Sequence, residues 1–294
     1  MILEINHHTT YRYASEVSLS PHYIRLRPRE DMFSRLHHFA MKVRPEGYVH
    51  WIRDPSDCPQ ARIFFPGATS DLSLDITMTV ENVVRKPFDF LLEPHAATFP
   101  FVYSEAEAAI LDPWLRPRTT DPENRLRRWL TDRTPPDGGG TVSFLFDLNR
   151  MIHESFDYRR RELHGVQSPG ETLDKGVGTC RDFAWLMAEG CRKLGLAARL
   201  AGGYMYVPGE GKIESGDPDS TLHAWTEVYL PGGGWRGVDP TNGVFCDEHY
   251  ITTVTGPTPD SITAMQGSYY HHTPVKSILH SVLNIEERSE PRQP

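Results

Sequence analysis

Residues 176–186 read GVGTCRDFAWL, a glycine-rich turn that runs directly into an amphipathic helix. Thr179 and Asp182 have the spacing of a capping box, which predicts that the helix begins at Cys180. An apolar stripe at helical spacing follows, formed by Cys180, Ala184, Met187, Cys191 and Leu194. A cysteine in the first turn lies at the positive end of the helix dipole, and this field favours the reactive thiolate over the thiol.

Two strands are predicted farther along the chain, TLHAWTEVYL at residues 221–230 and GWRGVD at residues 234–239, joined by a tight PGGG connection. A register in which paired residue numbers sum to 462 would place His223 opposite Asp239, with the two Cβ atoms about 5 Å apart. An aspartate at that distance can fix the tautomer of the histidine and stabilise an imidazolium. The order cysteine, histidine, aspartate is therefore one that a nucleophile, its base and an orienting carboxylate can take.

Each of these three residues also has a purely structural interpretation. A helical cysteine is often a small buried hydrophobe, and a histidine on a strand is usually structural. Asp239 precedes Pro240 and can act only as a turn former. The combination favours the catalytic interpretation, because the roles of nucleophile, base and orienting group are all filled.

Composition and charge narrow the classes of function. The 294 residues favour two domains, and a hydrophobic share of 38% is enough to form their cores. The net charge of −8 argues against a nucleic-acid partner, whose phosphates call for a basic surface. No apolar run approaches the roughly 20 residues of a membrane helix, and the N-terminus lacks the pattern of a signal peptide. The sequence therefore predicts a cytoplasmic protein with neither nucleic acid nor membrane as partner, and it says nothing of oligomeric state.

Neither a metal nor a cofactor is expected. The cysteines are Cys58, Cys180, Cys191 and Cys246. None of them forms the C-x-x-C pair that zinc and redox sites commonly use. Cys180 and Cys191 would lie about 16 Å apart on one helix, beyond the reach of a disulfide. The histidine pairs, such as His7 and His8, lack other ligands at suitable spacing, and the DPDS segment at 217–220 has too few ligands for a calcium loop.

Four segments are predicted along the chain. Residues 1–95 alternate apolar and polar positions between turn signals, which predicts a β-sandwich-like domain. Residues 96–140 would form a helical bridge that ends in a turn-rich connector. Residues 141–286 would form the catalytic core, and residues 287–294 a disordered tail.

Two local patterns refine this division. One strand of the first segment would bury a single face, made of Leu72, Leu74, Ile76 and Met78. Residues 207–220 are predicted to form a long loop of Gly, Pro and polar residues that ends just before His223. This loop either covers the edge of the site or is simply a linker.

The two motif-bearing segments, GVGTCRDFAWLMAEGCRKLGLAARLAGGYMY and LHAWTEVYLPGGGWRGVDPTNG, resemble the core of bacterial transglutaminase-like proteins, relatives of transglutaminases and papain-like cysteine peptidases. The segments HTTYRY and VSLSPHYIRLRPR resemble the β domain that often precedes this core. The resemblance implies an α+β fold in which a helix bearing the cysteine packs on an antiparallel sheet bearing the histidine and the aspartate. It also implies Cys180 as nucleophile, His223 as base and Asp239 as its partner, with a protein or peptide substrate and no cofactor.

The sequence departs from the family pattern at a few positions. Arg181 and Trp185 stand where many relatives carry glutamine and histidine, and residues 256–258 replace a common Gly-Arg-Asp segment with Gly-Pro-Thr. These departures leave the three catalytic positions intact, but they make substrate preference less transferable. An oxyanion formed at the site needs hydrogen-bond donors, and the backbone N–H of Cys180 is one expected donor. Tyr158 is a candidate for the second, and a buried core tyrosine is an equal alternative for this residue.

The expected reaction forms an acyl-enzyme on Cys180 with release of an amine. Hydrolysis of that intermediate would make the protein a cysteine peptidase or amidase, and attack by a second amine would make it a transglutaminase. Hydrolysis is favoured, because water is abundant in an open site and amine transfer needs a pocket that excludes it. A binding scaffold that keeps the triad without turnover is the third alternative.

Overall fold

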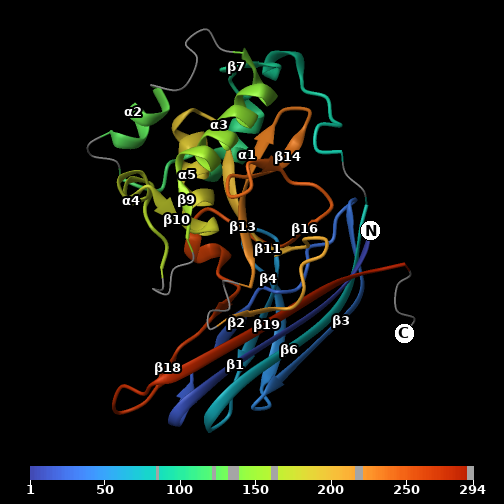
Figure 1. Cartoon of the computed structure of the whole chain (residues 1–294), viewed down its shortest axis with the longest axis vertical. Helices are drawn as coiled ribbons and strands as arrows, with labels where there is room; N and C mark the ends of the chain where they lie inside the picture. The colour runs from blue at the N-terminus through green and yellow to red at the C-terminus, as the bar shows by residue number, and fades with distance from the viewer. Residues whose placement is uncertain (84–85, 121–123, 132–138, 160–164, 216–220, 290–294) are drawn as a thin grey trace.

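The computed structural model describes residues 1–83, 86–120, 124–131, 139–159, 165–215 and 221–289. Long antiparallel strands fill one half of the molecule, and a helical bundle around a second sheet fills the other (Figure 1). The predicted α+β fold class is therefore confirmed. None of the helices in the described part of the chain has the length and apolar character that a membrane-spanning helix needs.

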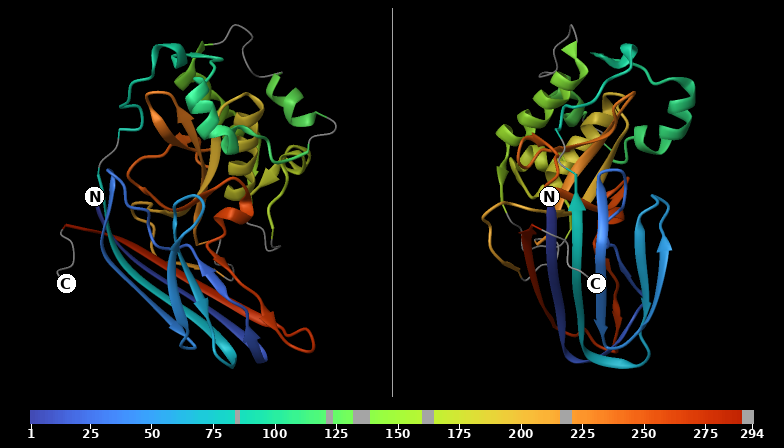
Figure 2. Two further views of the ribbon diagram at one scale, coloured as in Figure 1. Left: turned by 180° about the vertical axis from the view of Figure 1, so that it is seen from behind. Right: turned by 90° about the vertical axis from the view of Figure 1, so that its right-hand side faces the viewer.

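The first half is a sandwich of two sheets, and the right-hand view of Figure 2 shows the strands of the larger sheet side by side, from β19 in red to β3 in blue. One sheet has the order β12-β19-β1-β6-β3, with β18 also paired to β1, and the other has the order β17-β2-β5-β4. The strands are β1 (Ile2–Leu19), β2 (His22–Ile24), β3 (Ser34–Arg44), β4 (Tyr48–Arg53), β5 (Pro59–Phe64), β6 (Ala68–Asn82), β12 (Ile213–Ser215), β17 (Met265–Gln266), β18 (Tyr269–Tyr270) and β19 (Ser277–Arg288). The predicted one-sided strand is confirmed within β6, where Leu72, Leu74, Ile76 and Met78 are all buried.

In the described part of the second half, five helices cover a sheet of order β15-β14-β13-β11-β16, in which all neighbours are antiparallel, and α2 and α4 reach it only through α5. The helices are α1 (Glu105–Leu115), α2 (Arg125–Thr131), α3 (Thr141–Ser155), α4 (Pro169–Lys175) and α5 (Cys180–Lys193). The strands are β11 (Ala198–Met205), β13 (His223–Leu230), β14 (Gly234–Asp239), β15 (Val244–Phe245) and β16 (Tyr250–Gly256). Short pairs join β7 (Thr98–Phe99) to β8 (Gly139–Gly140) and β9 (Asp157–Tyr158) to β10 (Val177–Gly178), and single 3-10 turns cover Pro94–Ala96 and Pro259–Ile262.

The chain returns to the sandwich after the second half, which we call the helical half. Residues 277–286 were expected with the core, but they form most of β19, which pairs with β1 along its whole length from Ile2–Arg288 to Tyr13–Ser277. The expected tail begins inside this strand, and its residues 290–294 lie outside the described residues. Residues 207–212 of the expected loop are irregular, β12 follows them and pairs with β19, and residues 216–220 lie outside the described residues. The open edge of β19 supplies backbone partners that a local sequence pattern does not reveal.

Helix α5 is buried on nearly all sides instead of along the single predicted stripe. One side packs on β11 and β13, while α1, α2, α3 and α4 cover the remainder. Polar side chains at Asp182, Glu189 and Arg192 are consequently buried within the helical half. The helix is the central element of the fold, and its position fixes that of Cys180.

Gly203 allows β11 and β16 to approach each other closely, because a Cβ atom there would lie 2.0 Å from the carbonyl oxygen of Ile251. We expect Gly203→Ala to lower the free energy of unfolding by about 3 kcal/mol, since the two backbones must separate to admit the methyl group. Gly211→Ala is the matched control, as a Cβ there meets nothing within 4 Å, and it should change stability by no more than about 0.5 kcal/mol. Urea denaturation of both variants checks this, and equal midpoints would contradict it.

Candidate active site

The first turn of α5 is held by the carboxylate of Asp182, which is fully buried. Asp182 Oδ2 accepts hydrogen bonds from the backbone N–H of Thr179 at 2.8 Å and from its hydroxyl at 3.0 Å, which confirms the predicted capping box. The same carboxylate also accepts from the backbone N–H of Gln167 at 2.6 Å and from its side-chain amide at 3.3 Å. The contacts with Gln167 join the start of α5 to the segment before α4, so Cys180 is fixed by more than its own helix.

The hairpin of β13 and β14 carries His223 and Asp239, but not in the predicted register. Thr226 pairs with Val238, so paired residue numbers sum to 464 instead of 462, and the predicted register is wrong by two residues. A shift of two keeps side chains on the same face, because strands alternate with a period of two. The imidazole spans the resulting diagonal, and His223 Nε2 lies 2.7 Å from Asp239 Oδ2.

Asp239 is fully buried and saturated with hydrogen bonds. Its Oδ2 accepts from His223, from the amide of Asn242 at 2.7 Å and from the hydroxyl of Tyr250 at 2.7 Å. Its Oδ1 accepts from the backbone N–H of Thr241 at 2.9 Å. Burial would raise the pKa of Asp239, but the charge of His223 and these hydrogen bonds lower it to about 2. The carboxylate is therefore ionised at neutral pH, and its stabilising contribution is lost only as the pH falls from about 4 through about 2.

His223 is shielded by two aromatic rings. The ring of Trp225 stacks at a centroid distance of 6.3 Å, and that of Tyr250 lies at 6.1 Å. Burial by itself would lower the pKa of His223, but the charge and hydrogen bond of Asp239, with those of Cys180, raise it to about 10. The pair is therefore an imidazolium next to a carboxylate over the whole physiological range of pH.

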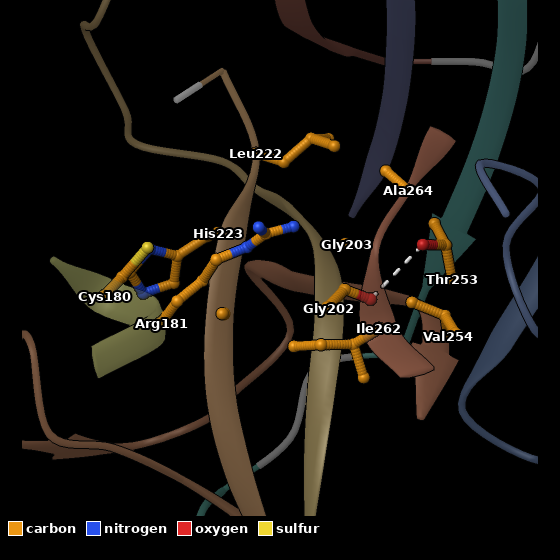
Figure 3. Close-up of a pocket in the computed structure, with 11 residues that line it drawn as sticks. Cys180, Arg181, Gly202, Gly203, Leu222, His223, Thr253, Val254, Ile262 and Ala264 are labelled. Atoms are coloured by element: carbon orange, nitrogen blue, oxygen red, sulfur yellow. Dashed lines mark hydrogen bonds between the residues drawn. The ribbon is translucent and has the colours of Figure 1, made fainter. Parts of the chain in front are cut away.

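Cys180 lies next to His223, and it is close enough to contribute to the raised pKa of the imidazole. Figure 3 shows the two next to each other, with Arg181 extending into the same pocket. The pocket is narrow, with a cavity volume of ≈ 10 Å³, and its remaining lining is mostly small or apolar, with Gly202, Leu222 and Ile262 among it. The structure thus brings the three residues predicted from the sequence together: Cys180 and His223 line the pocket, and Asp239 contacts His223 from behind it.

Tyr158 lies on β9, whose parallel pairing sets it next to Gly178, two residues before Cys180. The tyrosine is 49% exposed, which argues against the alternative of a core residue. It is not among the described residues that line the pocket. Its role as an oxyanion donor stays a prediction.

Asn242 and Tyr250 are the site residues that sequence reasoning missed. Asn242 lies three residues after Asp239 in the DPTN turn, where its side-chain amide can donate back to the aspartate. The sequence therefore did contain a signal for this residue. Tyr250 comes from β16, which reaches the site only because β16 pairs with β11 at the far side of the sheet from β14. No local pattern reports that strand order.

Within the described residues, one group has three potential metal ligands within 4.8 Å of one another, namely Asp247, Glu248 and His249. Oδ1 of Asp247 already lies 2.8 Å from Nδ1 of His249 and accepts from the backbone N–H of the same residue at 3.0 Å. The group therefore has a structural explanation as a turn. The DPDS segment at 217–220 lies outside the described residues.

Removing the Tyr250 hydroxyl tests its positioning role. We expect Tyr250→Phe to raise the pKa of Asp239 by about one unit, because the carboxylate loses one of its donors. A carbon-13 NMR titration of the Asp239 carboxylate in the wild type and in the variant measures this pKa. Tyr206→Phe is the control, since Tyr206 stacks on His249 instead. An unchanged pKa of Asp239 in Tyr250→Phe would show that the hydroxyl does not act through this carboxylate.

Comparison with known proteins gives matches to both halves of the chain. Residues 3–81 match a model described as the bacterial transglutaminase-like N-terminal region, and residues 132–240 match the transglutaminase-like superfamily. An uncharacterized protein of Mycobacterium tuberculosis is 27% identical over 292 residues, covering 90% of this chain and 87% of its own length. A protein-glutamine gamma-glutamyltransferase of Pseudomonas aeruginosa is 26% identical over 221 residues, covering 67% of this chain and 32% of that enzyme. The solved structure of a candidate cysteine protease from Cytophaga hutchinsonii has a TM-score of 0.73 at 18% identity, over 99% of this chain and 92% of that one, and so shares the fold.

Proposed function

This chain belongs to the transglutaminase-like superfamily, and from that premise we propose that it cleaves amide or peptide bonds with Cys180 as nucleophile, His223 as base and Asp239 as the orienting carboxylate. The observation that carries the proposal is the chain of contacts from Cys180 to His223 and on to Asp239 at 2.7 Å, formed at the start of a buried helix. Residues in these three roles are what thiol-based acyl transfer requires.

In the proposed reaction the Cys180 thiolate attacks the carbonyl carbon of an amide and forms a tetrahedral oxyanion. The backbone N–H of Cys180 and the hydroxyl of Tyr158 are the proposed donors to that oxyanion. Because Nε2 of His223 is engaged by Asp239, Nδ1 is the nitrogen that gives its proton to the leaving amine. The C–N bond breaks and an acyl-enzyme remains. Water then loses a proton to His223 and attacks the thioester, the C–S bond breaks, and a carboxylic acid is released with the Cys180 thiolate and the His223 imidazolium restored.

Amine transfer is the second candidate. The apolar lining next to Cys180, with Leu222, Val254 and Ile262, would disfavour water and admit the stem of a lysine-like amine. The relative from Pseudomonas aeruginosa is named for that activity. We keep hydrolysis as the first candidate, because the pocket is open to solvent and water needs no recognition.

The two reactions are separated by the mass of the product. The purified protein is incubated with a glutamine-containing casein substrate, with and without a primary amine, and the products are analysed by intact mass. Fragments or deamidation without amine incorporation are expected for the hydrolase. Incorporation of the amine would replace hydrolysis by transfer as the assigned function.

Selective alkylation of Cys180 distinguishes an enzyme from a scaffold without any substrate. His223 stays protonated below its pKa of about 10, so its positive charge persists next to the sulfur, whereas burial raises the pKa of Cys58 and raises that of Cys191 to about 12. We expect iodoacetamide at about pH 5.5 to modify Cys180 at least about 100-fold faster than the other cysteines. Peptide mapping by mass spectrometry measures this, and His223→Ala should remove the selectivity. Equal rates at all four cysteines would favour the scaffold.

The protein or peptide nature of the substrate, the absence of a nucleic-acid or membrane partner and the cytoplasmic location stay predictions from the sequence.

A further inference from the structure

A second and larger pocket lies where the sandwich meets the helical half. One wall is the segment 29–34 that leads into β3. The other is formed by residues of β11, β13, β14 and β16. Its cavity volume of ≈ 320 Å³ lies at the lower end of the range of small-molecule sites. Neither Cys180 nor His223 lines this pocket, so the site described above does not account for it.

The side chains that line this junction pocket include three guanidinium groups and two carboxylates. Both carboxylates are already engaged. Glu227 forms an ion pair with Arg199 at 2.7 Å, and the guanidinium of Arg199 lies 4.0 Å from the ring centroid of Trp235. Oδ1 of Asp31 accepts the backbone N–H groups of residues 33 and 34 at 2.7 and 3.0 Å. The pocket therefore carries a net positive charge within a protein of net charge −8.

Arg29 and Arg236 are the other two cations, one from each half of the molecule. The only hydrogen bond that the described residues offer the Arg29 guanidinium is a long one, 3.5 Å to the hydroxyl of Thr255. Arg236 donates from Nε to the carbonyl of Gly233 at 2.8 Å and lies over the ring of Phe90. Arg29, whose guanidinium makes only the long hydrogen bond to Thr255 among the described residues, is therefore suited to bind a carboxylate, because the two carboxylate oxygens match the planar arrangement of its N–H groups.

Ser34 adds an independent observation. The serine is only 9% exposed, it lines the pocket, and its hydroxyl is buried without a hydrogen-bond partner in the described structure. Buried polar groups are nearly always satisfied, so an orphaned hydroxyl at a pocket wall indicates a missing polar partner. Met32, Phe33 and Trp235 give the same pocket an apolar portion.

We propose that the junction pocket binds a small molecule or chain end that joins a carboxylate to an apolar or aromatic body. The carboxylate is held by Arg29, with the Ser34 hydroxyl as a further donor, and the apolar body lies against Met32 and Trp235. A compact polyanion fits less well, because the carboxylates of Asp31 and Glu227 also line the pocket, one from each wall. A bound ligand would touch both halves of the molecule and should stabilise their junction.

Isothermal titration calorimetry of the full chain tests the proposal with two ligands, N-acetyl-L-phenylalanine and its uncharged analogue N-acetyl-L-phenylalaninamide. The acid should bind at least about tenfold more tightly than the amide, because only the acid forms charge-assisted hydrogen bonds. Arg29→Gln should weaken the acid about tenfold and leave the amide unchanged. Arg29→Lys should retain part of the preference, and Ser34→Ala should weaken the acid less than Arg29→Gln does.

Arg53→Gln is the matched control, since Arg53 is an exposed arginine of the same sandwich, paired with Asp57. Circular dichroism of each variant confirms that it is folded. Equal binding of acid and amide, no binding of the acid to the folded wild type, or an unchanged affinity in Arg29→Gln would overturn the proposal. Inorganic phosphate binding as tightly as the acid would contradict the apolar half of it. None of these outcomes depends on the activity of Cys180.

Discussion

Replacing Cys180 by alanine should abolish amide cleavage while leaving the protein folded. The sulfur is the atom that bonds to the substrate in the proposed reaction, so the expected loss in kcat is about 10⁴-fold or more. The side chain is small and the turn that holds it is fixed by Asp182, so the free energy of unfolding should change by no more than about 1 kcal/mol.

The measurement is turnover of the casein substrate by Cys180→Ala, with urea denaturation of the same preparation. Cys58→Ala is the matched control, because it removes a buried thiol of the sandwich and should keep full activity. Full turnover by folded Cys180→Ala would remove this cysteine from the proposed mechanism. Loss of activity in both variants would point to damage to the fold.

Glu189→Ala should cause the largest loss of stability. Glu189 and Arg192 form an ion pair at 2.7 Å with no exposure of either side chain. Glu189 also accepts the backbone N–H groups of Arg118 and Thr119, and Arg192 donates to the carbonyl of Ala198. Removing the carboxylate would leave a buried guanidinium without its counter-charge, which costs about 3–5 kcal/mol.

Asp147→Ala is the control for this prediction. Asp147 and Arg150 have the same spacing of three residues on α3, but more than half of each side chain is exposed, so the change should lie within about 0.5 kcal/mol. Chemical denaturation of both variants gives the comparison. A similar small loss in both would mean that water reaches the Glu189 pair in solution.

Much of the site could be predicted because its signals are local. The capping box of Thr179 and Asp182 marks the start of α5 within four residues of sequence. Alternation together with the assumed register predicts that His223 and Asp239 share one face of a hairpin. The error of two in the register did not separate them, because an even shift preserves the face. An error of one residue would have predicted no site at all.

The missed features depend on contacts between distant segments. Tyr250 reaches Asp239 through the strand order of the second sheet, and the complete burial of α5 results from helices that approach from several parts of the chain. The pairing of β19 with β1 joins residues more than 260 positions apart. Periodicity reports which face of an element is apolar, but it does not report which other element covers that face.

The pairing of β1 with β19 also has a consequence for how the protein is made. On the ribosome, β1 can pair with β6 as soon as residue 82 has emerged, but the partners of its other edge are β18 and β19, which are synthesised only from residue 269 onwards. During that interval the nascent sandwich exposes the edge of a long strand, a known template for unwanted pairing with other chains. The helical half is therefore synthesised while the sandwich is incomplete, and it is the synthesis of β19 that covers most of the exposed edge.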